Sequence, residues 1–237
     1  MNKHCVIEYV KEFYFAMQDS KWKLVLKNYV KNNYKEYILT SLIFIIGLFI
    51  GVMIINNSTE TQSSEITTYL NEFITKFKGI QNINKTSLIF TSIKNNIILA
   101  VIIWAAGTTV IGLPIVLIAI LLRGLILGYT ISAVTLTLGA SKGIIFCLIS
   151  IFLQNILFIP AVLTLGVSSI KLYKSIMKDK RRENIKVEII RHTIISAIMI
   201  LVLVISSLIE NVISITLLKS FIKYFKKNSK KLFTILE

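Results

Sequence analysis

Long apolar runs alternate with short charged segments along this chain of 237 residues. The hydrocarbon core of a bilayer is about 30 Å thick, so a spanning helix needs roughly 20 apolar residues. The sequence therefore predicts an all-α, polytopic membrane helix bundle with about five transmembrane helices. These are Tyr37 to Ile55, two within the block from Ile97 to Leu138, one from residue 143 to about Ser168, and one from His192 to about Leu218.

Three residues are predicted to break the apolar helices. Gly112 and Pro114 divide the long block, because proline removes an amide donor and the residue before it avoids helical angles. A tight reversal at this point leaves two spans of suitable length. Pro160 is predicted to be a further helix break, within the fourth span.

The basic residues predict how the bundle is oriented. The chain has 27 Lys and Arg against 12 Asp and Glu, a formal net charge of +15. Residues 1–36 carry seven lysines and residues 171–191 carry eight basic groups. Because cytoplasmic loops collect Lys and Arg, we expect the N-terminus and loop 171–191 to be cytoplasmic. Four spans separate the two segments, so loop 56–92 is expected to be external.

Three regions are predicted on this basis: a basic amphipathic arm (1–36), a five-span membrane domain (37–218) and a basic amphipathic tail (219–237). The tail holds six lysines, although five spans place it outside. Its mixture of Phe, Ile, Leu and Lys suits an interfacial helix on an anionic surface. The alternative is a fifth segment that re-enters the membrane and leaves the tail inside.

Two amphipathic patterns lie outside the predicted spans. In the arm, apolar residues alternate with lysines, which favours anionic lipid over nucleic acid because no nucleic-acid-binding signature accompanies the charge. In loop 56–92, apolar residues recur at helical spacing. This stripe either lies on the membrane or the bundle, or forms a docking face for an external partner. Its members are Ile66, Tyr69, Leu70, Phe73, Ile74 and Phe77.

Composition excludes several classes of protein. The chain is 54% hydrophobic and 16% charged with a mean hydropathy of +0.73, which excludes a water-soluble globular domain. Two cysteines are too few for a disulfide-rich secreted domain. The abundance of Ile, Lys and Asn is typical of AT-rich coding sequence, so a single Asn or Ile was given no weight as a functional signal.

The chain carries no recognised catalytic motif. It has no glycine-rich phosphate loop, no His or Cys pair at metal-binding spacing and no Gly-x-Ser-x-Gly. The external acids Glu60, Glu65 and Glu72 fit a solvated helix face better than a hydrolytic site. We therefore expect no catalytic residue, cofactor or metal, and a protein that is not an enzyme.

Polar side chains within the predicted spans are the main candidate site residues, because a charge at mid-membrane is costly. They are Arg123, Gln154, Asn155 and Glu210. One interpretation is structural: such groups hydrogen-bond between helices and fix their positions. The alternative is a channel or transporter subunit that uses them to line a path. Counting residues along the helices places Arg123 and Glu210 at different depths, so a direct pair between them is not expected. Small residues, notably Gly124 and Gly128, favour close helix packing or a homo-oligomer.

The order of these features resembles the stage II sporulation protein M family over roughly residues 30–218. The resemblance rests on one span, an external loop, a turn between two spans, a polar pair before proline and a last span with a late acid. The residues concerned are Tyr69 to Phe73, Ile111 to Pro114, Arg123, Gly124, Gly128, Gln154, Asn155, Pro160, Ser207, Glu210, Ile213 and Ser214.

The resemblance implies an integral protein of the cell membrane that works at the sporulation septum and the engulfing membrane. It implies a non-enzymatic scaffold for two membrane-associated peptidoglycan hydrolases, stage II sporulation proteins D and P, which degrade septal peptidoglycan during engulfment of the forespore. The expected partners are therefore these hydrolases and membrane lipids, and not nucleic acid. Leu153, where proline is expected, and the long tail depart from the family pattern.

Overall fold

The computed structural model describes residues 22–79, 85–109, 111–147, 153–178 and 185–209. This part of the chain contains helices and short turns and no strand, so the predicted all-α class is confirmed. The helices are α2 (Trp22–Asn32), α3 (Tyr34–Asn56), α4 (Glu60–Gly79), α5 (Lys85–Gly107), α6 (Gly112–Leu138), α7 (Ala140–Cys147), α8 (Leu153–Lys178) and an unlabelled last helix, Ile185–Ile209.

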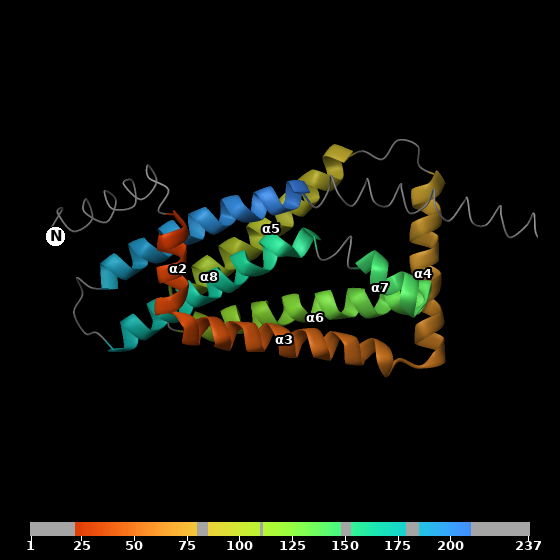
Figure 1. Ribbon diagram of the computed structural model, residues 1–237, viewed down its shortest axis with the longest axis horizontal. Coiled ribbons are helices and arrows are strands. Elements are labelled where there is room, and N and C mark those ends of the chain that lie inside the picture. The colour runs from red at the N-terminus through yellow and green to blue at the C-terminus, as the bar shows by residue number, and fades with distance from the viewer. Residues whose placement is uncertain (1–21, 80–84, 110, 148–152, 179–184, 210–237) are drawn as a thin grey trace, which may run out of the picture.

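Five of these helices are long and apolar enough to cross a membrane, as the sequence predicts. They run along the long axis of the molecule (Figure 1). The candidate spans are Tyr34–Asn56, Ile89–Gly107, Gly112–Leu138, Asn155–Met177 and Ile185–Ile209. We call the end where α3 begins and α8 finishes the α2 end, and the opposite end the α4 end.

The boundaries of two predicted spans are wrong. The fourth span does not follow directly on residue 143, because the separate short helix α7 occupies Ala140–Cys147 and the candidate span begins at Asn155. The last span begins at Ile185 and not at His192. The prediction assigned the basic segment 171–191 to a loop, but Lys171, Lys174 and Lys186 lie within the helices. The predicted loops 56–92 and 171–191 are correspondingly mostly helical.

The prediction of a helix break at Pro160 is also wrong, because α8 continues through it. Membrane helices tolerate proline where neighbouring helices and Ser or Thr hydroxyls compensate for the lost backbone bond. Here packing between helices offsets the loss, because Ala161 and Val162, directly after the proline, are buried in the bundle.

The break between α5 and α6 lies at residues 108–111, next to the predicted Gly112 and Pro114. Gly112 packs against the end of α5 so closely that a Cβ there would overlap the Ala106 carbonyl oxygen. Pro114 is the third residue of α6, within the first turn, where backbone amides have no partner in the helix. A proline is therefore tolerated at this position.

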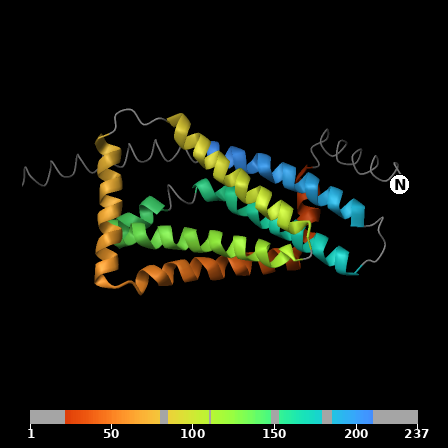
Figure 2. The ribbon, with the colours of Figure 1, turned by 180° about the vertical axis from the view of Figure 1, so that it is seen from behind.

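Two helices lie across the bundle and not along it. Figure 1 shows α2 crossing near the start of α3 and α4 standing across the opposite end, and Figure 2 shows α4 in the same relation from behind. The helix Ile185–Ile209 lies beside α5 in both views. Both helices are therefore oriented across the five candidate spans.

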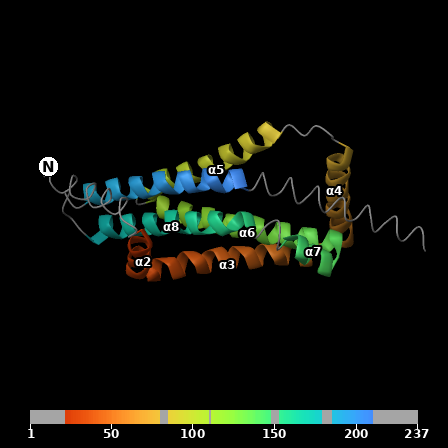
Figure 3. The ribbon, with the colours of Figure 1, turned by 45° about the horizontal axis from the view of Figure 1, so that its top comes forward.

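Glycines allow α3 and α6 to pack backbone to backbone. A Cβ at Gly47 or Gly51 would overlap a carbonyl oxygen of α6, and one at Gly124 or Gly128 would overlap a carbonyl oxygen of α3. Both helices run from the α2 end to the α4 end (Figure 3). Their two Gly-x-x-x-Gly pairs thus interlock in parallel, which is a common mode of close helix packing in membranes.

The bundle has a small core and a large apolar exterior. Side chains from all five candidate spans meet in the core: Phe44, Ala100, Ile103, Val116, Ile120, Phe158, Ala161, Val162, Leu165 and Leu203. Large apolar side chains such as Ile38, Phe49 and Leu201 are more than 60% exposed. Such a surface is unfavourable in water and favourable in lipid, so it supports the membrane assignment.

Candidate functional site

A chain of polar side chains links three helices in the middle of the bundle. One Nη of Arg123 in α6 donates to Asn96 Oδ1 of α5 at 3.2 Å. Asn96 Nδ2 donates to Ser207 Oγ of the last helix at 2.7 Å, and this bond is buried. Ser207 in turn donates to the Leu203 carbonyl oxygen at 2.9 Å. The network connects α5, α6 and the last helix, which are brought together only by the fold.

The Arg123 guanidinium is also stacked on an aromatic ring. Its central carbon lies 4.1 Å from the centroid of the Phe158 ring in α8, a cation–π distance. This contact adds a fourth helix to the network. The polar and aromatic contacts together lower the cost of holding a charged side chain within the apolar bundle.

A cavity of about 130 Å³ opens beside Arg123, between α3, α6 and α8. Its polar lining groups are Arg123, Thr130 and Asn155, and the remaining lining residues are Phe44, Ile126, Leu127 and Phe158. A polar cavity of this size can hold a few water molecules, because each occupies about 30 Å³ in the liquid. The structure thus brings together Arg123 and Asn155, two of the four polar residues singled out in the sequence.

The other two polar residues cannot be compared with the prediction. The backbone of Gln154 lies in α8, but its side chain is outside the described part, and Glu210 lies outside the described residues altogether. Ser207, three positions before Glu210, is linked to Arg123 through Asn96.

A second buried polar group lies at the α2 end. His192 is 1% exposed; its Nδ1 lies 2.9 Å from Ser168 Oγ of α8, and its Nε2 lies 3.3 Å from the Trp104 carbonyl oxygen of α5. A carbonyl only accepts, so Nε2 carries the proton of the neutral ring and Nδ1 accepts from Ser168. A Cβ at Gly107 would press on this imidazole. His192 therefore ties three helix ends together.

The helix α4 begins with a well-formed capping box. The Thr59 amide donates to Gln62 Oε1 at 3.1 Å, and the Gln62 amide donates to Thr59 Oγ1 at 3.4 Å. One residue earlier, the Ser58 hydroxyl contacts Ser63 Oγ at 2.8 Å and donates to the last turn of α3. These bonds fix the corner between α3 and α4, so the direction of α4 is set locally by the chain.

The predicted docking stripe on α4 is divided between two faces. Ile66 and Leu70 are half-buried, whereas Tyr69 is 72% exposed. Tyr69 shares the exposed face with Glu65, Thr68 and Glu72, which recur at three- and four-residue spacing. The side chains of Phe73, Ile74 and Phe77 lie outside the described part.

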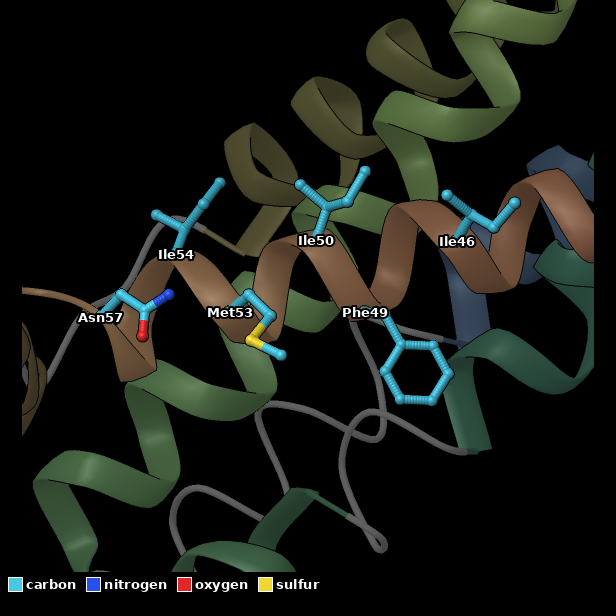
Figure 4. A pocket seen from close by; sticks show the side chains of 6 residues that line it. All are labelled: Ile46, Phe49, Ile50, Met53, Ile54 and Asn57. Carbon is cyan, nitrogen blue, oxygen red and sulfur yellow. The ribbon is translucent and has the colours of Figure 1, made fainter.

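An apolar hollow on the outer face of α3 is less informative. It measures about 510 Å³ and is lined by side chains of one helix and of its C-cap residue: Ile46, Phe49, Ile50, Met53, Ile54 and Asn57 (Figure 4). A hollow bounded by a single membrane helix is where lipid chains are expected. It provides no group able to bind a polar ligand except the Asn57 amide at its end.

The described residues offer little for catalysis. Across the described ranges, no three His, Cys, Asp or Glu side chains come close enough to hold a metal ion. The polar clusters around Arg123 and His192 consist of amides, hydroxyls, one guanidinium and one imidazole, arranged between helices. Their contacts are those of groups that fix helix positions.

Sequence reasoning missed several residues of these clusters. Asn96 was given no weight because the chain is rich in asparagine, and Ser207 was noted only as part of a family resemblance. Gly47 and Gly51 form a Gly-x-x-x-Gly pair that a search for small residues in the first span would have found. His192 entered the sequence prediction only as the start of the last span, because its burial depends on α5 and α8.

The family model described as Stage II sporulation protein M matches residues 40–215 of the chain. No curated protein sequence and no solved structure matches it. The matched residues include most of α3, the four later candidate spans, both interlocking glycine pairs and the polar network.

Proposed function

Because the chain belongs to the stage II sporulation protein M family, we propose that it is a non-enzymatic membrane scaffold that localises peptidoglycan hydrolases at the sporulation septum. The expected partners are stage II sporulation proteins D and P, which the family resemblance implies. Its five apolar helices and its family fit a multi-pass membrane protein of sporulation. In this proposal the chain holds and positions enzymes whose chemistry it does not perform.

One observation carries the proposal: α4 is a capped helix held across one end of the bundle with an exposed face. The capping box and the Ser58–Ser63 contact fix its start. Ile66 and Leu70 of the same helix are half-buried. The outward face carries Tyr69 and the carboxylates of Glu65 and Glu72. Tyrosine is enriched in protein-binding surfaces, and charged side chains occur in the polar rim around their centre. We propose this face, and not the whole apolar stripe, as the docking site.

The distribution of charge supports the orientation that a docking site for wall hydrolases requires. The α2 end carries Lys27, Lys31, Lys35 and Lys174, whereas α4 begins with an acidic and hydroxyl-rich segment. Under the positive-inside rule the α2 end is cytoplasmic and α4 is external, facing the wall. Cysteines at Lys27 and Thr61 test this orientation: an impermeant maleimide added to intact cells should label only Thr61→Cys.

The test of the scaffold is recovery of the two hydrolases with tagged protein from sporulating cells. Glu65→Lys combined with Tyr69→Ala should reduce recovery at least about tenfold, because both groups lie on the proposed surface. Tyr34→Ala is the matched control, since Tyr34 is 53% exposed at the opposite end. Undiminished recovery with the double variant would exclude this face of α4. Absence of both hydrolases from the unmodified preparation would exclude the scaffold itself.

The polar cavity beside Arg123 favours a second candidate function, a channel or transporter subunit. Arg123, Thr130 and Asn155 give this cavity a polar lining within the predicted membrane layer. This second function predicts that purified protein in liposomes conducts ions or solutes, and that the Asn155→Leu variant does not. Liposomes that show no flux above a protein-free control would remove it.

A further inference from the structure

The short helix α2 combines a fixed position with an exposed row of lysines. It lies across the bundle next to the start of α3 (Figure 1), where the membrane-spanning part begins. Lys27 and Lys31 of α2 are exposed, and so is Lys35 in the first turn of α3. The three lysines are spaced four residues apart along the chain.

Contacts with α3 and α8 hold α2 in place. The Tyr29 ring meets the Tyr37 ring edge-on with centroids 6.5 Å apart, and Lys171 Nζ lies 5.8 Å from the Tyr29 centroid. Between α2 and α3, the buried Asn33 donates from Nδ2 to the Tyr29 carbonyl oxygen at 2.6 Å. The direction of α2 is therefore set by the fold.

The described acids at this end are engaged by other bases. Glu36 accepts from Lys174 Nζ at 2.6 Å, and Glu188 pairs with Arg191 in the last helix. The positive charge of Lys27, Lys31 and Lys35 thus adds to a basic surface at the α2 end. Such a surface attracts anions.

Apolar neighbours place these lysines at the edge of the lipid. Val30 is 46% exposed and Tyr34 53%, between the lysines, and Ile38 is 62% exposed only three residues after Lys35. Three residues of helix cover about 4.5 Å. Lysine ammonium groups at this distance from the apolar layer reach the headgroup region, where basic helices meet anionic lipid.

We propose that α2 is an interfacial helix whose Lys27 and Lys31, together with Lys35 of α3, bind the headgroups of anionic phospholipids in the leaflet at the α2 end. The interleaved Val30 and Tyr34 favour a lipid surface over a nucleic acid, which would leave these apolar groups in water. This inference is independent of the proposed scaffold function, because it concerns the opposite end of the molecule. It makes the protein sensitive to the anionic lipid content of its membrane.

The experiment uses the full chain in nanodiscs prepared from equal amounts of phosphatidylglycerol and phosphatidylethanolamine. The ratio of the two lipids retained after detergent extraction is measured by mass spectrometry. Lys27→Gln/Lys31→Gln/Lys35→Gln should lower the ratio of phosphatidylglycerol to phosphatidylethanolamine at least about threefold. The charge-preserving Lys27→Arg/Lys31→Arg/Lys35→Arg variant should keep it. Lys94→Gln, which removes an exposed lysine of α5, is the control and should also keep it.

A second measurement uses the unmodified protein and does not depend on how the variants fold. Raising the salt from about 0.1 M to 1 M shortens the screening length from about 10 Å to 3 Å, so the lipid ratio should fall. A ratio that stays unchanged in the glutamine variant, or in high salt, would overturn the proposal. A nucleic-acid site would also overturn it. In that case a labelled oligonucleotide binds the protein in nanodiscs of neutral lipid and does not bind the glutamine variant, while this variant leaves the lipid ratio of the mixed nanodiscs unchanged.

Discussion

Asn96 and Ser207 lie 111 positions apart in the sequence and share a buried hydrogen bond of 2.7 Å. Asn96 uses both ends of its amide, since Nδ2 donates to Ser207 and Oδ1 accepts from Arg123. A single asparagine thereby links the second, third and last spans. Bonds of this kind between membrane helices contribute about 0.5–2 kcal/mol each.

Replacing Asn96 should therefore destabilise the bundle more than replacing its neighbour. Asn96→Leu removes both bonds, and we expect the free energy of unfolding in mixed micelles to fall by about 1–3 kcal/mol. Asn95→Leu is the matched control because Asn95 is exposed on the same helix. Titration with sodium dodecyl sulfate measures both; an equal effect of the two substitutions would contradict the role of Asn96.

The interlocked glycines predict an unusual sensitivity to a single methyl group. Gly47→Ala places a Cβ against the Leu121 carbonyl oxygen, where only backbone can move aside. Overpacking of this kind costs about 1–3 kcal/mol, so the same titration should show a loss of stability. Ile46→Ala changes the adjacent exposed position and should have little effect. Wild-type stability of Gly47→Ala would show that α3 and α6 are not packed this closely.

Because the imidazole of His192 is buried, replacing it should lower the free energy of unfolding more than replacing the neighbouring Thr193. His192→Leu leaves the buried Ser168 hydroxyl without its partner, and we expect a loss of about 1–3 kcal/mol in unfolding free energy. Thr193→Val removes two exposed bonds, one from Trp104 Nε1 at 3.3 Å and one to the Ile189 carbonyl oxygen at 2.9 Å, and should cost less than about 1 kcal/mol. The reverse order of the two effects would be inconsistent with this arrangement.

The buried position of Cys147 at the end of α7 predicts that its thiol reacts slowly. Cys147 is 6% exposed, and burial raises the pKa of its thiol above the ordinary value. Because the thiolate is the reactive form, less of it is present at neutral pH, and labelling should increase only at higher pH than for a free thiol. In a Cys5→Ser background, maleimide should label native Cys147 slowly at pH 7 and rapidly after denaturation.

A control for this labelling is Thr61→Cys in a Cys5→Ser/Cys147→Ser background. Thr61 is exposed in α4 at the same end of the bundle, so its cysteine should be labelled within the first time points. Fast labelling of native Cys147 at pH 7 would mean that its Sγ does not lie against α6, where the Ile131 carbonyl oxygen is 3.9 Å away.

Part of the candidate site follows from sequence because the bilayer penalises polarity. Arg123 and Asn155 stand out in apolar runs, and the structure places both at one cavity. Their partners do not stand out. Asn96 lies at the middle of α5, at the end of a mixed polar first half, and its role depends on Ser207, which belongs to a helix far along the chain.

Pro160 illustrates the same limit for local structure. Proline lacks the backbone N–H that an interior helix position needs, so a helix break is the expected result from sequence. The packing of Ala161 and Val162 against the other spans outweighs this local penalty, so α8 continues. The short helix α7 could not be separated from the fourth span in the sequence, because both are apolar.

The sequence by itself determined the helical class and the five spans, because the thickness of the hydrocarbon layer sets the length of an apolar helix whatever its neighbours are. Only the tertiary structure decided which faces meet. Helices such as α3 and α6 are apolar on every side, so periodicity cannot distinguish a lipid-facing side chain from a core one. Close approach of the glycines and hydrogen bonds between distant polar groups make that distinction, and both require the helices to be in place.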